Sequence, residues 1–301
     1  MIRLHEAKML QTLHRSLIPN IPEAIKVYGA IFHINCGNPF NLEVLVDSWP
    51  DYHTVITRPQ KQEMIDDRDR YTNTYHIFSK NLQKLPEILE SESVINWKQS
   101  LTIQGCQKGL DEKIRDAVAS KSIQVNYNKR FLYVTDNVLK SITSNTSKLM
   151  KPLKVASAEN LKFISTNNNF RPSLLSVFHA ELINNNWKFG QNEKSLRFVK
   201  RCLQNFPGYC LLDSEGNPIS WTILEHTSEM RMSYSLPEYQ RRGFAKQVMN
   251  NFMEYLQKND TIFYGQVEET NEAAQKFLKS VGFSAVDCGG YEWECIPADF
   301  I

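Results

Sequence analysis

The sequence predicts an α+β protein made of two halves. Its 301 residues exceed the usual single domain, so two domains of roughly 150 residues are the default expectation. Strand-like and amphipathic helix-like segments alternate in both halves, and 42% of the residues are apolar, enough for an ordinary core. A stretch rich in Ser, Asn, Thr and Lys lies between the halves. We therefore expect an N-terminal α/β domain at 1–137, a polar linker at 138–170 and a second domain at 171–301.

Composition and charge narrow the classes of protein that fit this chain. The formal net charge is +2, and a protein whose main partner is nucleic acid normally carries a more concentrated basic face. No apolar run approaches the roughly 18 residues of a spanning helix, so we expect no integral membrane protein. The six cysteines are dispersed without a C-x-x-C pair, and the seven histidines show no metal-ligand spacing. We expect no bound metal and a reduced, intracellular protein.

The first residues, MIRLHEAKMLQTLHRSL, allow two interpretations. They are basic overall, and Leu10, Leu13 and Leu17 fall on one helical face, as in a transit peptide. Glu6 is present, however, serines are few and no cleavage signal is evident. An ordinary first helix of the domain fits at least as well, so this segment leaves the compartment open.

Strand-like runs dominate the N-terminal half. The segments IKVYGAIFHIN, LEVLVDSW and HTVITRP are rich in β-branched and aromatic residues and are separated by turn residues. Further along, GLDEKIRDAVASK has the spacing of an amphipathic helix. In order, we expect strands at 25–35, 42–49 and 53–59, a helix at 82–92, a strand at 101–105, a helix at 109–121, and strands at 122–127 and 130–136.

The C-terminal half begins with helices and continues with a meander of strands. Two amphipathic segments come first, and a turn around Gly216 separates the first two strands. The order of elements is similar to that of the first half, but no residue-level repeat links the two, so a duplication would rest on element order alone. In order, we expect helices at 172–187 and 192–206, strands at 208–213, 218–225 and 229–236, a helix from 244, a strand at 261–267, a helix at 271–281, and strands at 283–288 and 291–296.

The segment PEYQRRGFAKQVM raises the question of what caps its helix. From Phe244 onward the apolar residues have a helical period, but no Ser, Thr, Asp or Asn stands at the entry to satisfy the first free backbone N–H groups. Two arginines stand there instead, at the positive end of the helix dipole, where an anion is favoured. Small residues let a ligand approach the backbone closely. The residues expected to bind that anion are Gln240, Arg241, Arg242, Gly243, Phe244 and Ala245.

The order of elements and this loop together resemble the GNAT acyltransferase superfamily. Gln240, Gly243 and Ala245 match its phosphate loop, which reads Gln or Arg, two residues, Gly, one residue, then Gly or Ala. The resemblance implies a GNAT fold in the C-terminal half and identifies the anion as the pyrophosphate of coenzyme A. The N-terminal half has no such loop, so we expect a GNAT-like arrangement at most, packed against the catalytic half and shaping its pocket.

A second match to the superfamily lies downstream. Asn271, Ala274, Gly282 and Phe283 fit its fourth helix and the turn that follows. The resemblance implies that Asn271 hydrogen-bonds the pantetheine arm; a polar residue at a helix N-terminus explains it equally well. The superfamily often has a tyrosine that protonates the departing thiolate where this chain has Leu278, which leaves the general acid unassigned.

The strand EMRMSYSL carries a candidate base. It alternates, with Glu229, Arg231, Ser233 and Ser235 on one face. Because it precedes the phosphate loop, it should run beside the thioester of a bound acyl-coenzyme A. An amine acceptor is protonated at neutral pH and must lose a proton before it attacks, and a partly buried carboxylate at Glu229 can take that proton. The alternative is a structural Glu229, solvated or paired with Arg231.

Longer segments resemble one family in particular. The stretches IKVYGAIFHINCGNPFNLEVLVDSWPDY, INWKQSLTIQG and SEMRMSYSLPEYQ, among others, are similar to the glycine N-acyltransferase family over nearly the whole chain. The resemblance implies acyl transfer from acyl-coenzyme A, a cosubstrate rather than a permanent cofactor, to the amine of glycine or another small amino acid such as glutamine. It also implies that Glu229 is the base, and favours mitochondrial detoxification by amino-acid conjugation, with cytoplasm and endoplasmic reticulum still open. The alternatives are a GNAT enzyme acting on a protein amine and a coenzyme A-binding protein without turnover.

The acceptor site is harder to assign. An amino acid brings a carboxylate, which favours a bidentate cation, so Arg231 is either its clamp or only the partner of Glu229. In the GNAT fold the first two helices border the acceptor site, which implies roles for residues between them: Asn186, Trp187, Asn192 and Glu193. A helix cap at Asn192 beside a packed tryptophan is the competing interpretation.

Overall fold

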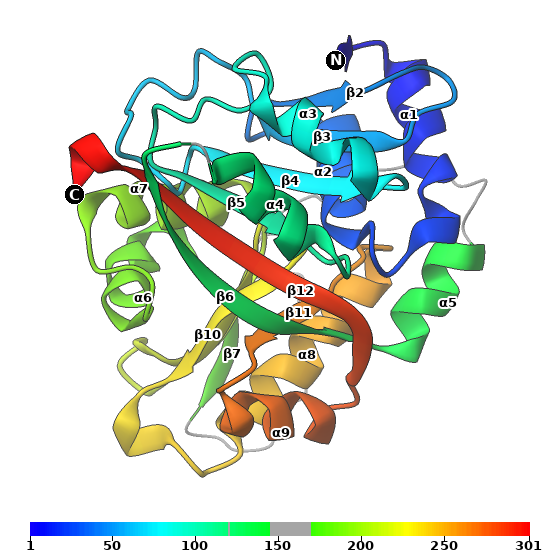
Figure 1. The fold of residues 1–301 in the computed structure, drawn as a ribbon. Coiled ribbons are helices and arrows are strands. Elements are labelled where there is room, and N and C mark those ends of the chain that lie inside the picture. The colour runs from blue at the N-terminus through cyan, green and yellow to red at the C-terminus, as the bar shows by residue number, and fades with distance from the viewer. Residues whose placement is uncertain (120, 145–169) are drawn as a thin grey trace.

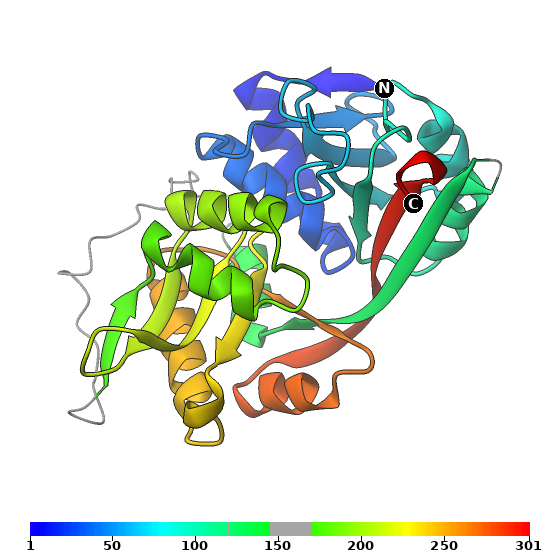
Figure 2. The same ribbon diagram turned by 90° about the vertical axis from the view of Figure 1, so that its left-hand side faces the viewer.

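The computed structural model describes residues 1–119, 121–144 and 170–301, which form two β-sheets with helices packed against them (Figures 1 and 2). The larger sheet has the strand order β1-β2-β3-β4-β5-β12-β6-β11, and the smaller has the order β10-β9-β8-β7. The strands are β1 (Ile2–Leu4), β2 (Leu42–Val46), β3 (Thr54–Pro59), β4 (Thr74–Ser79), β5 (Leu101–Gly105), β6 (Ile123–Val134), β7 (Arg171–Leu174), β8 (Gly208–Leu212), β9 (Pro218–Leu224), β10 (Met230–Ser235), β11 (Gly265–Glu268) and β12 (Ser284–Pro297). The α-helices are α1 (Ala7–Ser16), α2 (Ile25–Asn35), α3 (Leu85–Glu90), α4 (Leu110–Val118), α5 (Asp136–Ser144), α6 (Ala180–Asn186), α7 (Glu193–Asn205), α8 (Phe244–Lys258) and α9 (Glu272–Ser280).

The two halves follow one order of elements. Apart from α5 and the short 3-10 turns, β1-α1-α2-β2-β3-β4-α3-β5-α4-β6 is followed by β7-α6-α7-β8-β9-β10-α8-β11-α9-β12. The last strands are exchanged between the halves: β12 pairs with β5, and β11 pairs with β6. Figure 1 shows β12 running beside β6 along almost its whole length. The larger sheet therefore crosses the boundary expected at 137, and the two halves are built into each other.

One predicted strand is wrong. The segment expected as a strand at 25–35 is helix α2, and nine of its eleven residues, from Ile25 to His33, are buried. A short apolar run that is buried on all sides has no polar face, so its sequence pattern cannot distinguish a buried helix from a buried strand. The helix lies very close to the segment before β10: a Cβ added to Gly29 would stand 1.9 Å from the carbonyl oxygen of Thr227.

Other differences concern strand number and length. β1 and β4 were not expected, and the segments 122–127 and 130–136 form the single strand β6 because it pairs continuously with β12. The two terminal strands are likewise one strand, β12, with a register shift between Val286 and Gly290. The helix expected at 172–187 begins only at α6, because β7 precedes it as the edge strand of the smaller sheet.

Both ends of the first half pack into the fold. Leu10, Leu13 and Leu17 are buried in the main apolar core, so α1 is an integral helix of the domain. Helix α5 occupies the start of the expected linker and buries Val138 and Ile142, while residues 145–169 lie outside the described part of the chain. No helix among the described residues is long and apolar enough to cross a bilayer.

A cleft distinguishes the second half from the first. In the first half, β4 and β5 pair as parallel strands and close the sheet. Their counterparts β10 and β11 meet only where Glu229 bridges Tyr264, and beyond that point they belong to different sheets. The second half therefore has an open space between two strand ends that the first half lacks.

Candidate active site

A cavity of ≈ 340 Å³ lies in this cleft. Its walls are Glu229 with β10 from Met230 to Tyr234, β11 from Gly265 to Glu268, one face of α9, and the end of α6 with the loop that follows, from Asn186 to Phe189. Arg130 of β6 closes one side. The strand expected to lie beside a thioester therefore does line a cavity of ligand size.

The N-terminus of α8 lacks a side-chain cap, as the sequence predicts. Gly243 is the N-cap residue, with φ 84°, and makes no side-chain cap hydrogen bond to the first turn. Arg241 has φ 59°, and Gln240 donates from Nε2 to the carbonyl oxygen of Ser235 at 3.0 Å. Residues 240–243 are all exposed, so their backbone and the two guanidinium groups can be reached by an anion from solution.

The remaining residues of this loop have structural contacts. The guanidinium of Arg242 lies within 5.2–5.7 Å of the rings of Phe170, Tyr239 and Phe244. Phe244 itself is buried in the core, so only its backbone faces the helix entry, and Ala245 is half-buried. Among these residues, side-chain charge for an anion can come only from Arg241 and Arg242.

Glu229 is almost completely buried at the inner end of the cavity. Its Oε2 accepts a hydrogen bond from Nζ of Lys26 at 2.6 Å, and the two side chains are 1% and 2% exposed. Its Oε1 lies 3.8 Å from Nε of Arg231 and has no hydrogen-bond partner among the described residues. Two cations thus lie beside the carboxyl group, and its Oε1 has no hydrogen bond from a described residue.

Lys26 was not expected as a site residue. It lies on α2, 203 residues before Glu229 in the chain, on the helix face that also carries Gly29 and His33. Gly29 allows the backbones to touch, and His33 meets the hydroxyl of Ser228 at 2.9 Å from its Nε2. The only sequence signal was a lysine inside an otherwise apolar run, which is unusual unless its charge is paired.

Arg231 is surrounded by carboxylates. Its Nη1 donates to Glu225 at 3.1 Å, and its Nη2 lies 3.6 Å from Glu292. Burial lowers the pKa of Arg231, but Glu225, Glu229 and Glu292 outweigh it and raise the pKa above its ordinary value. Burial likewise opposes ionisation of Glu225, yet the charge of Arg231 holds the pKa of Glu225 well below its usual range. Whether Arg231 binds the acceptor carboxylate or only pairs with Glu229, its guanidinium already has three acidic neighbours.

Buried histidines surround this network and stay neutral at pH 7. Burial is the largest cause in each case: it lowers the pKa of His226 to about 4 and those of His14 and His33 to about 3. The pKa of His76 also lies well below its usual value. His226, Arg231 and Glu292 line a small cavity of ≈ 30 Å³.

The expected alternation of β10 breaks in the middle. Its register against β9 shifts between Arg231 and Tyr234, where Met232 has φ 55°. Ser233 and Ser235 therefore turn towards β9, bonding to Thr222 at 2.8 Å and to Ser220 at 2.7 Å. A bulge leaves one residue of the strand unpaired beside the cavity.

The residues predicted between the first two helices separate into two groups. Asn186 and Trp187 line the cavity, and the ring of Trp187 lies 5.6 Å from the guanidinium of Arg231. Asn192 instead caps α7, accepting from the backbone N–H groups of Lys194 and Ser195 at 3.0 Å. Glu193 is exposed in the first turn of α7 and lies outside the cavity wall.

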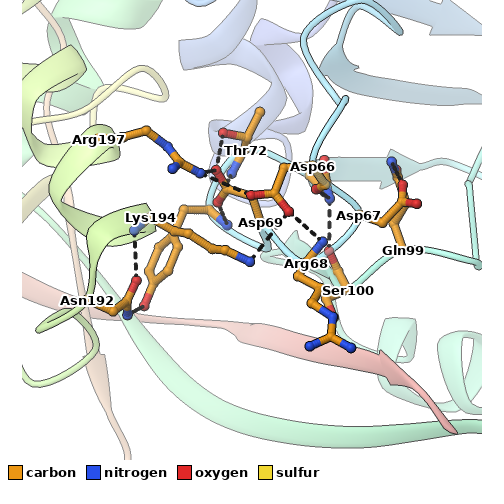
Figure 3. Close-up of polar contacts among 12 residues, drawn as sticks. Asp66, Asp67, Arg68, Asp69, Thr72, Gln99, Ser100, Asn192, Lys194 and Arg197 are labelled. Atoms are coloured by element: carbon orange, nitrogen blue, oxygen red, sulfur yellow. Dashed lines mark hydrogen bonds and ion pairs between the residues drawn. The ribbon is translucent and has the colours of Figure 1, made fainter. Parts of the chain in front are cut away.

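A loop of the first half, which carries Asp66 and Asp69, is bonded to the start of α7 (Figure 3). Asp66 and Asp69 both pair with Nη2 of Arg197 at 3.1 Å, tying the loop before β4 to α7. Tyr71, in the same loop, donates its hydroxyl to the carbonyl oxygen of Phe189 and accepts a bond from Asn192. The N-terminal half thereby fixes the loop that carries the cavity residues Trp187 and Phe189.

The far wall of the cavity is α9. Asn271 lines it and also caps the helix, accepting from the backbone N–H of Ala274 at 3.1 Å, so the structure is compatible with both of its predicted roles. Leu278 lines the same wall and offers no proton. The described residues contain no cluster of three His, Cys, Asp or Glu side chains that could hold a metal ion.

The chain resembles known proteins along its whole length. It matches the family model described as aralkyl acyl-CoA:amino acid N-acyltransferase at residues 1–207 and that of its C-terminal region at 209–297. It is 46% identical over 300 residues to the human glycine N-acyltransferase-like protein 2, covering 100% of both chains. It is 42% identical over 298 residues to human glycine N-acyltransferase and 41% over 297 to the bovine enzyme, covering at least 99% of each chain.

Solved structures share the fold at low sequence identity. A crystal structure of a Drosophila protein aligns with a TM-score of 0.73 at 14% identity, covering 98% of both chains. A GCN5-related N-acetyltransferase-like protein from Streptococcus suis aligns with a TM-score of 0.51 at 13% identity, covering 97% of this chain and 100% of its own. The α+β architecture and the GNAT fold are therefore confirmed.

Proposed function

This chain belongs to the aralkyl acyl-CoA:amino acid N-acyltransferase family and is an acyltransferase, and we propose that it transfers an acyl group from acyl-coenzyme A to the amine of glycine or, as the second choice, glutamine. The observation that carries the proposal is Glu229, which lines the cavity between β10 and β11 and whose Oε1 has no hydrogen-bond partner among the described residues. We propose that Glu229 is the general base. The uncapped N-terminus of α8 is proposed to bind the pyrophosphate of coenzyme A, with Asn271 beside the pantetheine arm.

The proposed reaction is a direct attack. The acceptor ammonium gives a proton to Oε1 of Glu229, the neutral amine attacks the thioester carbonyl, the new C–N bond forms and the C–S bond breaks as the thiolate departs. As the amide forms, the attacking nitrogen loses its second proton, which balances the proton taken up by the departing thiolate, and the amide and coenzyme A are released. Leu278 cannot relay that proton, and Glu229 returns the first proton to solvent. We propose that backbone groups at the β10 bulge hydrogen-bond the thioester oxygen, because the register shift there interrupts the ladder to β9.

A covalent acyl-cysteine intermediate has no support in the site. None of the described residues that line the cavity is a cysteine. Burial raises the pKa of Cys36 to about 11 and those of Cys210, Cys288 and Cys295 to about 12, and it also raises the pKa values of Cys106 and Cys202. A thiol that stays protonated at pH 7 is a poor nucleophile.

We propose that the N-terminal half is the part that shapes this pocket rather than a second catalytic domain. It contributes Arg130 to the cavity wall, pairs Lys26 with Glu229, and holds the loop of Trp187 through Tyr71. A mitochondrial role in detoxification is proposed from the family resemblance alone, and cell fractionation tests it.

The function is tested by measuring thiol release. A panel of acyl-coenzyme A donors, with phenylacetyl-coenzyme A as the aralkyl member, is combined with glycine, glutamine, other amino acids and a lysine-containing peptide. Release that depends on a free amino acid supports the proposal. Release with the peptide alone would identify a protein acetyltransferase, and binding of coenzyme A without any release would identify a binding protein.

A further inference from the structure

Two buried polar atoms in the wall of the cavity have no hydrogen-bond partner among the described residues. One is Oε1 of Glu229, an acceptor, and the other is Nε of Arg130, a donor. The two residues are 1% and 4% exposed. No other residue of this wall is among the described side chains with such an orphaned atom. Buried polar groups are nearly always satisfied, so an unmatched pair facing one cavity indicates a ligand that supplies both partners.

Arg130 is held in position by its other contacts. Its Nη2 donates to Oε1 of Glu292 at 2.7 Å, and its guanidinium lies 5.1 Å from the ring centre of Phe189. Gln104 bonds the second oxygen of Glu292 at 2.8 Å. These contacts fix the plane of the guanidinium, and they leave Nε without a hydrogen-bond partner among the described residues.

Arg231 is less suited to hold a ligand carboxylate. Each face of its guanidinium fork already meets a carboxylate: Glu225 at Nη1, Glu292 at Nη2 and Glu229 at Nε. To bind another anion it would have to release one of these buried partners, which is costly. Arg231 therefore serves better as the link that joins Glu229 to the rest of the network.

The charges of the site match an amino-acid zwitterion. Lys26, Arg130 and Arg231 balance Glu225, Glu229 and Glu292, so the buried network is neutral before a ligand enters. A zwitterion adds no net charge, and its ammonium and carboxylate complement the two orphaned atoms. An amine without a carboxylate would leave the Nε of Arg130 buried and unsatisfied.

We propose that Arg130 binds the α-carboxylate of the acceptor while Glu229 takes its ammonium proton. This inference rests on the proposed function and deepens it. It defines the acceptor as a free α-amino acid, and it excludes polyamines and the lysine side chains of proteins. It also makes the specificity for the acceptor a property of β6, a strand of the N-terminal half.

The test compares glycine with glycinamide, which has the same amine and no carboxylate. Wild-type protein is expected to prefer glycine in kcat/KM by roughly 10–100-fold, the usual effect of an unsatisfied buried donor. Arg130→Gln should raise KM for glycine, leave KM for the acyl-coenzyme A within about twofold, and bring the preference close to one. Comparing the ratio between variants cancels the different basicities of the two amines.

Two further variants separate binding from folding. Arg130→Lys keeps the charge beside Glu292 but has no nitrogen at the Nε position, so it should fold and still lose most of the preference. Arg58→Gln removes another buried arginine, which pairs with Glu43 at 2.9 Å. Because Arg58 lies on β3, several strands away from β6 in the larger sheet, this variant should leave the glycine preference unchanged.

The outcomes distinguish this inference from the proposed function. If wild-type protein uses glycine and glycinamide equally, or if both Arg130 variants keep the wild-type preference, the assignment of Arg130 is wrong while the acyltransferase proposal stands. If wild-type protein acylates no amino acid with any donor, the proposed function fails, and this inference fails with it.

Discussion

Replacing Lys26 with methionine tests whether the buried ion pair between Lys26 of the N-terminal half and Glu229 stabilises the protein. Methionine keeps the length of the side chain and removes the charge that lies 2.6 Å from Oε2 of Glu229. Removing one member of a buried ion pair costs roughly 3–5 kcal/mol, because the other charge stays buried. Arg231, 3.8 Å from the second oxygen, retains part of the compensation, so we expect about 3 kcal/mol. With an unfolding entropy of about 2 cal/mol/K per residue, this lowers Tm by roughly 5 °C for 301 residues.

The assay is a double-mutant cycle followed by thermal melts. Lys26→Met combined with Glu229→Gln removes both charges, so the loss should be smaller than the sum of the single losses by roughly 2 kcal/mol. Lys129→Met is the matched control, since its bond to Glu269 is also 2.6 Å long but the two side chains are 39% and 46% exposed. It should change stability by less than about 1 kcal/mol. A Tm for Lys26→Met within 1 °C of wild type, or strict additivity in the cycle, would refute the reasoning.

Three further predictions concern the ligand, the mechanism and the response to acid. Coenzyme A should raise Tm, and Gly243→Glu should abolish that shift by placing a carboxylate at the helix entry. Gly216→Glu is the control, since Gly216 is another left-handed glycine with open surroundings, and it should keep the shift. A full shift in Gly243→Glu would disprove the loop assignment. Intact-mass spectra during turnover should show no acyl adduct, and an adduct on any cysteine that forms and decays at the turnover rate would overturn direct attack. The buried histidines take up protons below about pH 6.5 when unfolded but only near pH 3–4 when folded, so stability is full above pH 6.5 and falls as pH drops towards 4. Each can contribute up to about 1.4 kcal/mol per pH unit, and a Tm that stays constant from pH 7 to pH 5 would contradict this.

Features encoded by neighbouring residues could be predicted from the sequence. The meander of the second half, the uncapped entry to α8 and the cap at Asn271 all depend on residues within one or two turns of each other. Glu229 could be proposed from the sequence because it stands at the start of the strand that leads into the loop before α8. These relations join residues that are close in the sequence, so the spacing of those residues predicts them.

Features made by distant parts of the chain could not. Lys26 reaches Glu229 because α2 packs on the segment before β10, and Arg130 reaches the cavity wall because β6 pairs with β11 of the second half. The residues next to Lys26 and Arg130 in the sequence do not indicate that Glu229 and Glu292 are their partners. The misread of 25–35 has the same origin, since burial on all sides by distant elements removed the polar face that would have identified a helix.

The central claim, that Glu229 is the base of an amino-acid acyltransferase, is tested most directly by pH–rate profiles of wild type and Glu229→Gln. Both are measured from pH 6 to 10 with saturating acyl-coenzyme A, well below the Tm of the variant, after its affinity for coenzyme A has been shown to be unchanged. We predict a kcat lower by roughly 10²–10⁴-fold near neutral pH. The deficit should shrink as pH rises, because more of the acceptor amine is then already neutral. Profiles that stay parallel across the whole range would contradict the assignment, even if the variant were slow throughout.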